Sequence, residues 1–373
     1  MHISSNFDGG NIICHASETP DNIRLSIRKD AHSDFYQWFY FRLSGAESQA
    51  CKMTIENAAG AAFKGGWEDY NACASYDRKT WFRVPTKHEN DQLVISHTPE
   101  HNSVFYAYFA PYSMERHADL IAQSQLDDRV SASVIGQTLD GQDMDLLTIG
   151  SPDPAKKKIW VIARQHPGEI MAEWWMEGFL ERLLGDERTA KQLFDQCVFY
   201  VIPNMNPDGS KRGHLRTNAS GANLNREWGA ATMERSPEVL LVMHKMEESG
   251  VDFCLDVHGD EALPYNFIAG AEGVPSFTDE AQKWLSDFKA NYVKSSPDFQ
   301  IKHGYALTAK GKANLTMCTN YVAETFGCLS MTLEMPFKDN ADRPDPKYGW
   351  SPARAARLGH DVLEPILAHV NRL

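Results

Sequence analysis

Two residue types that bind zinc lie three positions apart in the string His166-Pro167-Gly168-Glu169. Imidazole nitrogen and carboxylate oxygen are both zinc ligands, and a tight turn can direct them at one ion. The spacing alone is weak evidence, because roughly two such pairs arise by chance in a chain with 14 His and 50 acidic residues, and six occur here. Position favours this pair. It follows the predicted strand Ile159–Ala163, and open α/β sheets build their sites at the C-terminal ends of strands.

Two further predicted strands end in polar residues. His258 follows Phe253–Val257, where it could complete a set of two histidines and one carboxylate, with a position left for water or substrate. Glu334 follows Leu329–Leu333, where it could take a proton from water and deliver it to a leaving amine. The alternatives are a core histidine bonded to the backbone and a glutamate paired with a nearby Arg or Lys. The shared position at strand ends favours the chemical roles.

A fourth predicted strand is followed by a segment, residues 204–228, that contains Arg216, Asn225 and Arg226. The free C-terminus of a peptide is a carboxylate, for which Arg provides a charge-assisted and bidentate clamp while Asn adds a neutral donor. An Arg near a metal could instead stabilise a developing oxyanion. Lys211 and Arg212 in the same segment are more simply explained as residues of a solvated loop.

The elements that position these residues fall into two parts. Up to residue 112, short aromatic and β-branched segments alternate with turn residues, which predicts an all-β sandwich domain over residues 1–112. In residues 113–373, apolar strands alternate with amphipathic helices, which predicts an α/β domain whose mixed or parallel sheet is flanked by helices. The predicted strands of this second part are Asp143–Ile149, Ile159–Ala163, Cys197–Ile202, Phe253–Val257 and Leu329–Leu333. The predicted helices are Tyr112–Gln125, Ile170–Leu184, Pro237–Ser249, Asp279–Ser295 and Pro352–Asn371.

Composition narrows the classes of function. The net charge of −13 disfavours general binding to nucleic acid or to an anionic membrane. The 7 cysteines are odd in number and form no CxxC pair, which favours buried thiols in a reducing compartment. The sequence shows neither a secretory signal nor an apolar run long enough to span a membrane. A cytoplasmic globular protein is expected.

In combination, these motifs follow the order found in zinc metallocarboxypeptidases. The chain resembles the bacterial type of their cytosolic carboxypeptidase branch, whose members include deglutamylases. The matching strings are NMNPDG, RTNASGANLNREW, DVHGDE and MTLEMPF, together with SNFDGGNI, QWFYFRL and YFAPYS near the N-terminus. The resemblance covers nearly the whole chain. It implies an N-terminal β-sandwich followed by an α/β catalytic domain with a mixed eight-stranded sheet.

The resemblance also implies a role for each residue. His166, Glu169 and His258 would bind one zinc ion, Arg216 would polarise the scissile carbonyl, and Glu334 would activate water. Asn225 and Arg226 would hold the terminal carboxylate of a peptide or protein tail.

Three positions depart from the family's pattern or leave it open. Asn223 stands where an aspartate commonly orients a zinc-ligand histidine, and an amide is the weaker acceptor. A tyrosine usually closes over the substrate; Tyr321 is the first candidate, with Tyr305 and Tyr265 as alternatives. Asn314 aligns approximately with the arginine that recognises a terminal glutamate in several relatives.

The predicted function is a zinc carboxypeptidase that removes C-terminal residues, and Lys310 and Lys312, close to Asn314, suggest a preference for glutamate. Two other functions compete with it. A related zinc amidohydrolase acting on N-acyl amino acids would use the same metal set and clamp, although such enzymes usually lack the aromatic β-rich domain. A non-catalytic module that binds tails would need one essential group to be missing.

Overall fold

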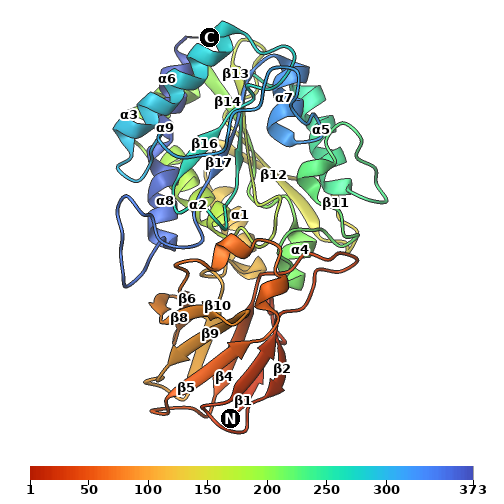
Figure 1. Cartoon of the computed structure of the whole chain (residues 1–373). Helices are drawn as coiled ribbons and strands as arrows, with labels where there is room; N and C mark the ends of the chain where they lie inside the picture. The colour runs from red at the N-terminus through yellow and green to blue at the C-terminus, as the bar shows by residue number, and fades with distance from the viewer. Residues whose placement is uncertain (373) are drawn as a thin grey trace.

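The N-terminal part of the computed structural model, which describes residues 1–372, consists of two five-stranded sheets (Figure 1). The first has the order β1 (His2–Ser4), β4 (Tyr40–Ser44), β10 (Ser103–Ala107), β6 (Ala72–Ser75), β7 (Phe82–Val84). The second has the order β2 (Ile13–Ala16), β3 (Ile23–Ser26), β5 (Cys51–Ile55), β9 (Gln92–His97), β8 (Thr86–Glu89). Buried and exposed residues alternate along β3 and β5, so one face of that sheet points into the core. The domain boundary after residue 112 stays a prediction.

The second part is built on a mixed sheet with the order β11-β12-β14-β13-β15-β17-β16. Its strands are β11 (Val130–Gln137), β12 (Asp143–Ile149), β13 (Lys157–Ala163), β14 (Cys197–Ile202), β15 (Phe253–Val257), β16 (Phe267–Ala269) and β17 (Leu329–Glu334). The four central strands run parallel, and the outer ones are antiparallel to their neighbours. The mixed sheet is confirmed.

The sheet has seven strands within residues 1–372, where the family resemblance implied eight. The difference arises at the edge of the sheet that β16 forms. β16 is three residues long, and beyond it the chain pairs only through an isolated bridge between Asn266 and Phe299. A single bridge does not continue into a ladder.

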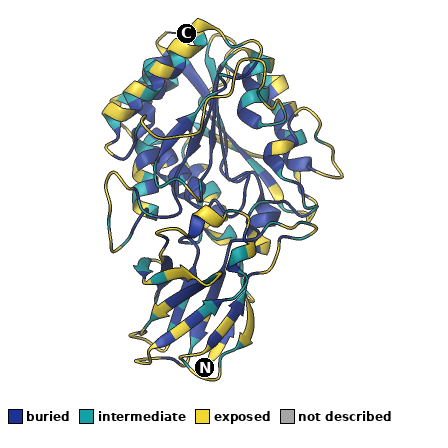
Figure 2. Ribbon diagram, viewed as in Figure 1, coloured by how far each residue is buried: buried dark blue, intermediate teal, exposed yellow. Residues whose placement is uncertain are grey.

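Helices cover both faces of this sheet, as Figure 1 shows. One side carries α2 (Met171–Leu183), α3 (Arg188–Gln196), α6 (Asp279–Ser295), α8 (Pro352–Asp361) and α9 (Leu363–Val370), and the other carries α5 (Pro237–Ser249) and α7 (Cys318–Phe326). Strand β13 explains why both faces are covered. Ile159 and Val161 pack into the hydrophobic core on the side of α2, whereas Trp160 and Ile162 pack into the core on the side of α5. A strand that is apolar on both faces has to be buried on both. Figure 2 shows these strands buried and the outer surfaces of the helices exposed.

The predicted helix Pro352–Asn371 is two helices, which meet at Val362. Pro365 explains the break, because proline has no N–H to donate to the carbonyl four residues earlier and its ring crowds that carbonyl. The helix predicted from Tyr112 begins at Met114 as α1 (Met114–Ser124), where Ser113 caps it. Within the described part of the chain, no helix combines the length and apolar character needed to cross a membrane.

Candidate active site

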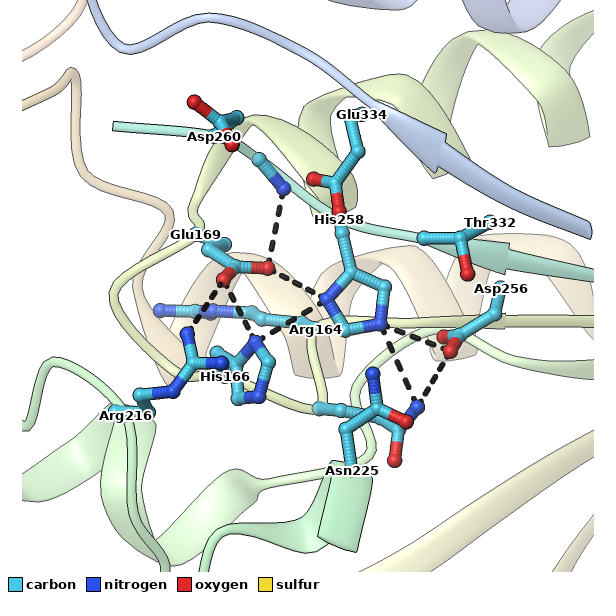
Figure 3. Close-up of polar contacts among 12 residues, drawn as sticks. Arg164, His166, Glu169, Arg216, Asn225, Asp256, His258, Asp260, Thr332 and Glu334 are labelled. Carbon is cyan, nitrogen blue, oxygen red and sulfur yellow. Dashed lines mark hydrogen bonds and ion pairs between the residues drawn. The ribbon is translucent and has the colours of Figure 1, made fainter. Parts of the chain in front are cut away.

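The C-terminal ends of the parallel strands bring the predicted residues together (Figure 3). The turn containing His166 and Glu169 follows β13, His258 follows β15, and Glu334 is the last residue of β17. The segment after β14 supplies Arg216. Because β14, β13, β15 and β17 are adjacent and parallel, side chains from distant parts of the sequence meet at one edge.

His166, Glu169 and His258 form a buried cluster with the geometry of a metal site. The two carboxylate oxygens of Glu169 each lie 2.7 Å from a histidine Nδ1, Oε1 from His166 and Oε2 from His258. The two Nδ1 atoms are 3.2 Å apart, and one ligand atom from each residue lies within 4.8 Å of the others. The three residues are at most 2% exposed. Three ligand atoms that converge in a buried position are better explained as a site for one metal ion than as ordinary polar contacts of the core.

The remaining nitrogen of each histidine has its own acceptor. His166 Nε2 lies 2.9 Å from Asn223 Oδ1, and His258 Nε2 lies 2.9 Å from Asp256 Oδ2. An imidazole that donates from Nε2 keeps the lone pair of Nδ1 for a metal. Two neutral imidazole nitrogens and one carboxylate oxygen fit zinc, with a further position open.

The two histidines differ electrostatically because their partners differ. Burial and the nearby Arg216 lower the pKa of His166 to about 4. Burial also acts to lower the pKa of His258, but the carboxylates of Asp256 and Glu169 raise it well above its ordinary value. The family's pattern would place a carboxylate at position 223, beside His166, where this chain has Asn223. A carboxylate is present beside the other histidine, where Asp256 contacts His258. The sequence analysis singled out Asn223 but not the compensating carboxylate of Asp256.

Asp256 belongs to a chain of hydrogen bonds that the sequence analysis missed. Trp228 Nε1 donates to Gln165 Oε1 over 2.9 Å, and Gln165 Nε2 donates to Asp256 Oδ2 over 2.6 Å. Asp256 is fully buried inside β15, in a segment interpreted only as an apolar strand. The available signal was a carboxylate inside that strand two residues before His258, since a buried charge needs a partner.

Replacing Asp256 by Asn should weaken zinc binding by roughly 10- to 100-fold, because the imidazole of His258 loses its charged acceptor and becomes a poorer ligand. Zinc affinity would be measured by competition with a chromophoric chelator. Asp252→Asn is the matched control, since Asp252 lies just before the same strand and accepts a hydrogen bond from Lys158 N, 2.8 Å away. Equal affinities of Asp256→Asn and the unaltered protein would contradict the proposed role of Asp256.

A buried arginine supports the turn that carries His166. Arg164 has a left-handed backbone conformation, with φ of 60°, and is 1% exposed. Its guanidinium donates to Pro167 O over 3.0 Å and to Glu173 Oε2 over 2.5 Å. Glu173 in turn lies 2.6 Å from His117 Nδ1. The turn therefore rests on a buried ion-pair network, which the sequence analysis also missed.

Glu334 has one oxygen bonded and one unbonded. Its Oε1 lies 3.1 Å from the hydroxyl of Tyr305, whereas Oε2 is buried and has no hydrogen-bond partner within residues 1–372. Burial raises the pKa of Glu334 well above its ordinary value, and Glu169 and Asp260 raise it further. An unpaired and buried carboxylate oxygen is costly unless a ligand or a water molecule uses it.

Of the candidates for the tyrosine that closes over the substrate, Tyr305 contacts Glu334, whereas Tyr321, the first candidate, packs elsewhere. The Tyr305 hydroxyl lies 2.6 Å from Asp260 Oδ2 and 3.1 Å from Glu334 Oε1. Tyr321 packs against Trp228 with ring centroids 6.0 Å apart. Tyr321 lies in α7, and spacing along the sequence could not indicate which way the ring faces.

A cavity of about 500 Å³ opens beside Glu334. Its polar lining, within the described residues, includes Asn225 and Asn314 but neither Arg216 nor Arg226. Asn225 uses its Oδ1 to accept from Cys318 N over 2.8 Å, which leaves its amide nitrogen for a ligand. Arg226 donates to the backbone oxygen of Asn225 over 2.6 Å.

The charged residues around this cavity are mainly lysines. Lys289, Lys302 and Lys312 line it together with two carboxylates, Glu272 and the proposed base Glu334. Lys310 donates to the backbone oxygen of Phe277, and it is not among the described residues that line the cavity.

Known proteins match the whole chain. Residues 3–109 match the cytosolic carboxypeptidase N-terminal domain, and residues 114–355 match the zinc carboxypeptidase family. The structure of a metallo-carboxypeptidase from Burkholderia cenocepacia is 50% identical, with a TM-score of 0.97 and 100% of both chains covered. A metallo-carboxypeptidase from Pseudomonas aeruginosa, solved in complex with (2-guanidinoethylmercapto)succinic acid, is 44% identical, with a TM-score of 0.97 over 100% of this chain and 99% of that one. Cytosolic carboxypeptidase 6 of Caenorhabditis elegans is 26% identical over 89% of this chain and 78% of its own length.

Proposed function

This chain belongs to the zinc carboxypeptidase family, and from that premise we propose that it hydrolyses the C-terminal peptide bond of peptides or protein tails with one zinc ion held by His166, Glu169 and His258. The resemblance to the cytosolic carboxypeptidase branch, with its N-terminal domain, is confirmed, and the chain is a metallocarboxypeptidase. The observation that carries the proposal is the convergence of the three buried ligands beside Glu334, whose Oε2 lacks a partner in residues 1–372.

Glu334 is the proposed proton carrier. A zinc ion bound by the three ligands would supply a Lewis acid for the scissile carbonyl and for water. Glu334 Oε2 accepts a proton from the attacking water and then delivers it to the departing nitrogen, so the carboxylate is regenerated. A carboxylate with a raised pKa suits this task, since it takes up and returns the proton more evenly than an ordinary exposed one. Tyr305, bonded to Glu334 Oε1, is the proposed residue that closes over the substrate.

Arg216 and the pair Asn225 and Arg226 are the proposed binding groups. Arg216 Nη1 lies 3.7 Å from Glu169 Oε1, so its charge lies beside the ligand set, where it can stabilise a carbonyl oxygen that becomes negative. Asn225 lines the cavity that would receive the terminal residue, and the contact with Cys318 N uses its Oδ1 and not its amide nitrogen. Arg226 adjoins it and adds the charge that a terminal carboxylate needs.

The terminal residue preferred is proposed to be acidic. The cavity lining has three lysines against two glutamates, Glu272 and Glu334, and this small excess of positive charge favours a glutamate side chain. No arginine occupies position 314, so we expect a looser preference than a bidentate contact would give. A cytoplasmic location is also proposed, because all seven cysteines are free thiols.

The function is tested with a peptide whose C-terminus is either a free carboxylate or an amide. The free peptide should lose single residues from its C-terminal end, and amidation should lower kcat/KM by at least about 100-fold, because the charged pair with the clamp is lost. Released amino acids would be measured by mass spectrometry. An unaffected rate would contradict the clamp. Faster hydrolysis of an N-acyl amino acid than of any peptide would instead indicate the amidohydrolase.

A further inference from the structure

The loop that carries Arg216 is held by a residue of the N-terminal β region. Asp30 is 3% exposed and accepts hydrogen bonds from three consecutive backbone amides of that loop, those of Leu215, Arg216 and Thr217, over 2.7, 2.8 and 2.9 Å. The hydroxyl of Thr217 donates to the same carboxylate over 3.2 Å. These residues lie between α4 (Pro207–Arg212) and the next helical turn at residue 224, so no helix or strand pairs their amides. Asp30 provides the partners that the loop itself lacks.

The guanidinium of Arg216 also rests on the N-terminal region. Its carbon Cζ lies 5.1 Å from the ring centroid of Phe63 and 5.7 Å from that of Phe35. A cation over aromatic faces is attracted by their negative charge distribution and is restricted in direction. The same side chain is 14% exposed and lies 3.7 Å from Glu169. The guanidinium is thus held between two aromatic rings of one region and the metal ligands of the other.

Three further contacts fix the course of this loop. Asn11 Nδ2 donates to Gly213 O over 2.8 Å, and Ala31 N donates to His214 Nε2 over 3.1 Å. Gly213 has φ of 71°, and a Cβ there would lie 2.6 Å from the backbone oxygen of Gly9. The two backbones approach so closely that a side chain is excluded. The loop and the N-terminal region therefore fit as one unit.

We propose that Asp30 is a positioning residue for catalysis, which fixes the backbone at residues 215–217 so that the Arg216 guanidinium faces the reacting carbonyl. The N-terminal region thereby completes the active site instead of forming a separate binding module. This inference rests on the proposed role of Arg216 in peptide hydrolysis.

The test is a double-mutant cycle of Asp30→Asn and Arg216→Ala. In Asp30→Asn an amide N–H₂ faces backbone N–H groups, so the loop shifts, and kcat should fall by roughly 10- to 100-fold because small misplacements of a catalytic group have effects of that size. KM should change by no more than about twofold, and zinc affinity should be unchanged, since Arg216 acts on charge that develops during the reaction. In the Arg216→Ala background, Asp30→Asn should change kcat by less than about twofold, because residues that act through one another are not additive.

Asp77→Asn is the matched control. Asp77 lies in the same region and accepts from two backbone amides, those of Lys79 and Thr80, but both belong to its own loop. Its substitution should leave kcat unchanged in both backgrounds. Equal losses from Asp30→Asn with and without Arg216, or no loss at all, would overturn the inference even though the unaltered protein cleaves peptides.

Amide hydrogen exchange separates this inference from the function on which it rests. Asp30→Asn should accelerate exchange at residues 215–217, whereas Asp77→Asn should not, and this readout does not depend on turnover. Unchanged exchange would refute the positioning role. Absence of peptide hydrolysis by the unaltered zinc-loaded protein would refute the proposed function, and the catalytic part of the inference with it.

Discussion

Glu334→Gln should lower kcat by about 10²- to 10⁴-fold while the zinc content and the fold stay unchanged. Glutamine has nearly the same shape and keeps an oxygen for the Tyr305 hydroxyl, but its amide cannot accept a proton from water. Glu334 is 7% exposed, and its Oε2 has no other partner in the described residues, so the substitution removes the base without breaking an ion pair. Steady-state kinetics on a peptide with a free C-terminus would measure the change.

The control for this experiment is Glu324→Gln, on the outer surface of α7. Glu324 accepts hydrogen bonds from the backbone and hydroxyl of Ser276 and lies outside the cavity lining. Its activity should match that of the unaltered protein. Metal analysis and thermal unfolding of both variants would show that only catalysis has changed. Comparable turnover by Glu334→Gln would exclude Glu334 as the base.

Removal of zinc should abolish peptide hydrolysis, and one equivalent of zinc per chain should restore it. The donor set of two imidazoles and one carboxylate suits zinc, and Mg²⁺, which prefers oxygen ligands, should not restore activity. The ligands are at most 2% exposed, so we expect slow loss to a chelator. Elemental analysis before and after dialysis against a chelator, followed by titration with zinc, would measure the stoichiometry.

The apoprotein should remain folded. The carboxylate of Glu169 lies 2.7 Å from both histidine Nδ1 atoms and accepts from Gly259 N over 3.1 Å, so protein groups surround it. Burial acts to raise the pKa of Glu169, but the two histidines hold it below its ordinary value, so the charge has partners. Far-ultraviolet circular dichroism should therefore be unchanged. Full activity in protein that contains far less than one zinc per chain would contradict the metal-dependent mechanism.

The positions of the site residues followed largely from local patterns. An apolar run such as Phe253–Val257 has to be buried on both faces, and the first polar residue after it lies at the rim of the sheet. His258 and Glu334 were found in this way, because the end of a buried strand is visible in the sequence. The same periodicity predicted most strands of the sheet to within two residues.

Contacts between distant segments could not be predicted without the fold. Spacing along the chain could not show that Tyr305 contacts Glu334, since Tyr305 lies in a loop and loops have no periodicity that sets the direction of a side chain. Asp256 lies within an apolar strand, and only the fold showed that Gln165 and His258 are its partners.

Local patterns were enough to predict the order of strands and helices and the residue types at each strand end, because burial imposes a periodicity on neighbouring residues. Tertiary structure decided how many strands join the sheet, which acceptor faces each histidine, and that Asp30 supports Arg216 from 186 residues away. These features escape local patterns because a hydrogen bond between distant segments depends on the packing of all the elements that lie between them.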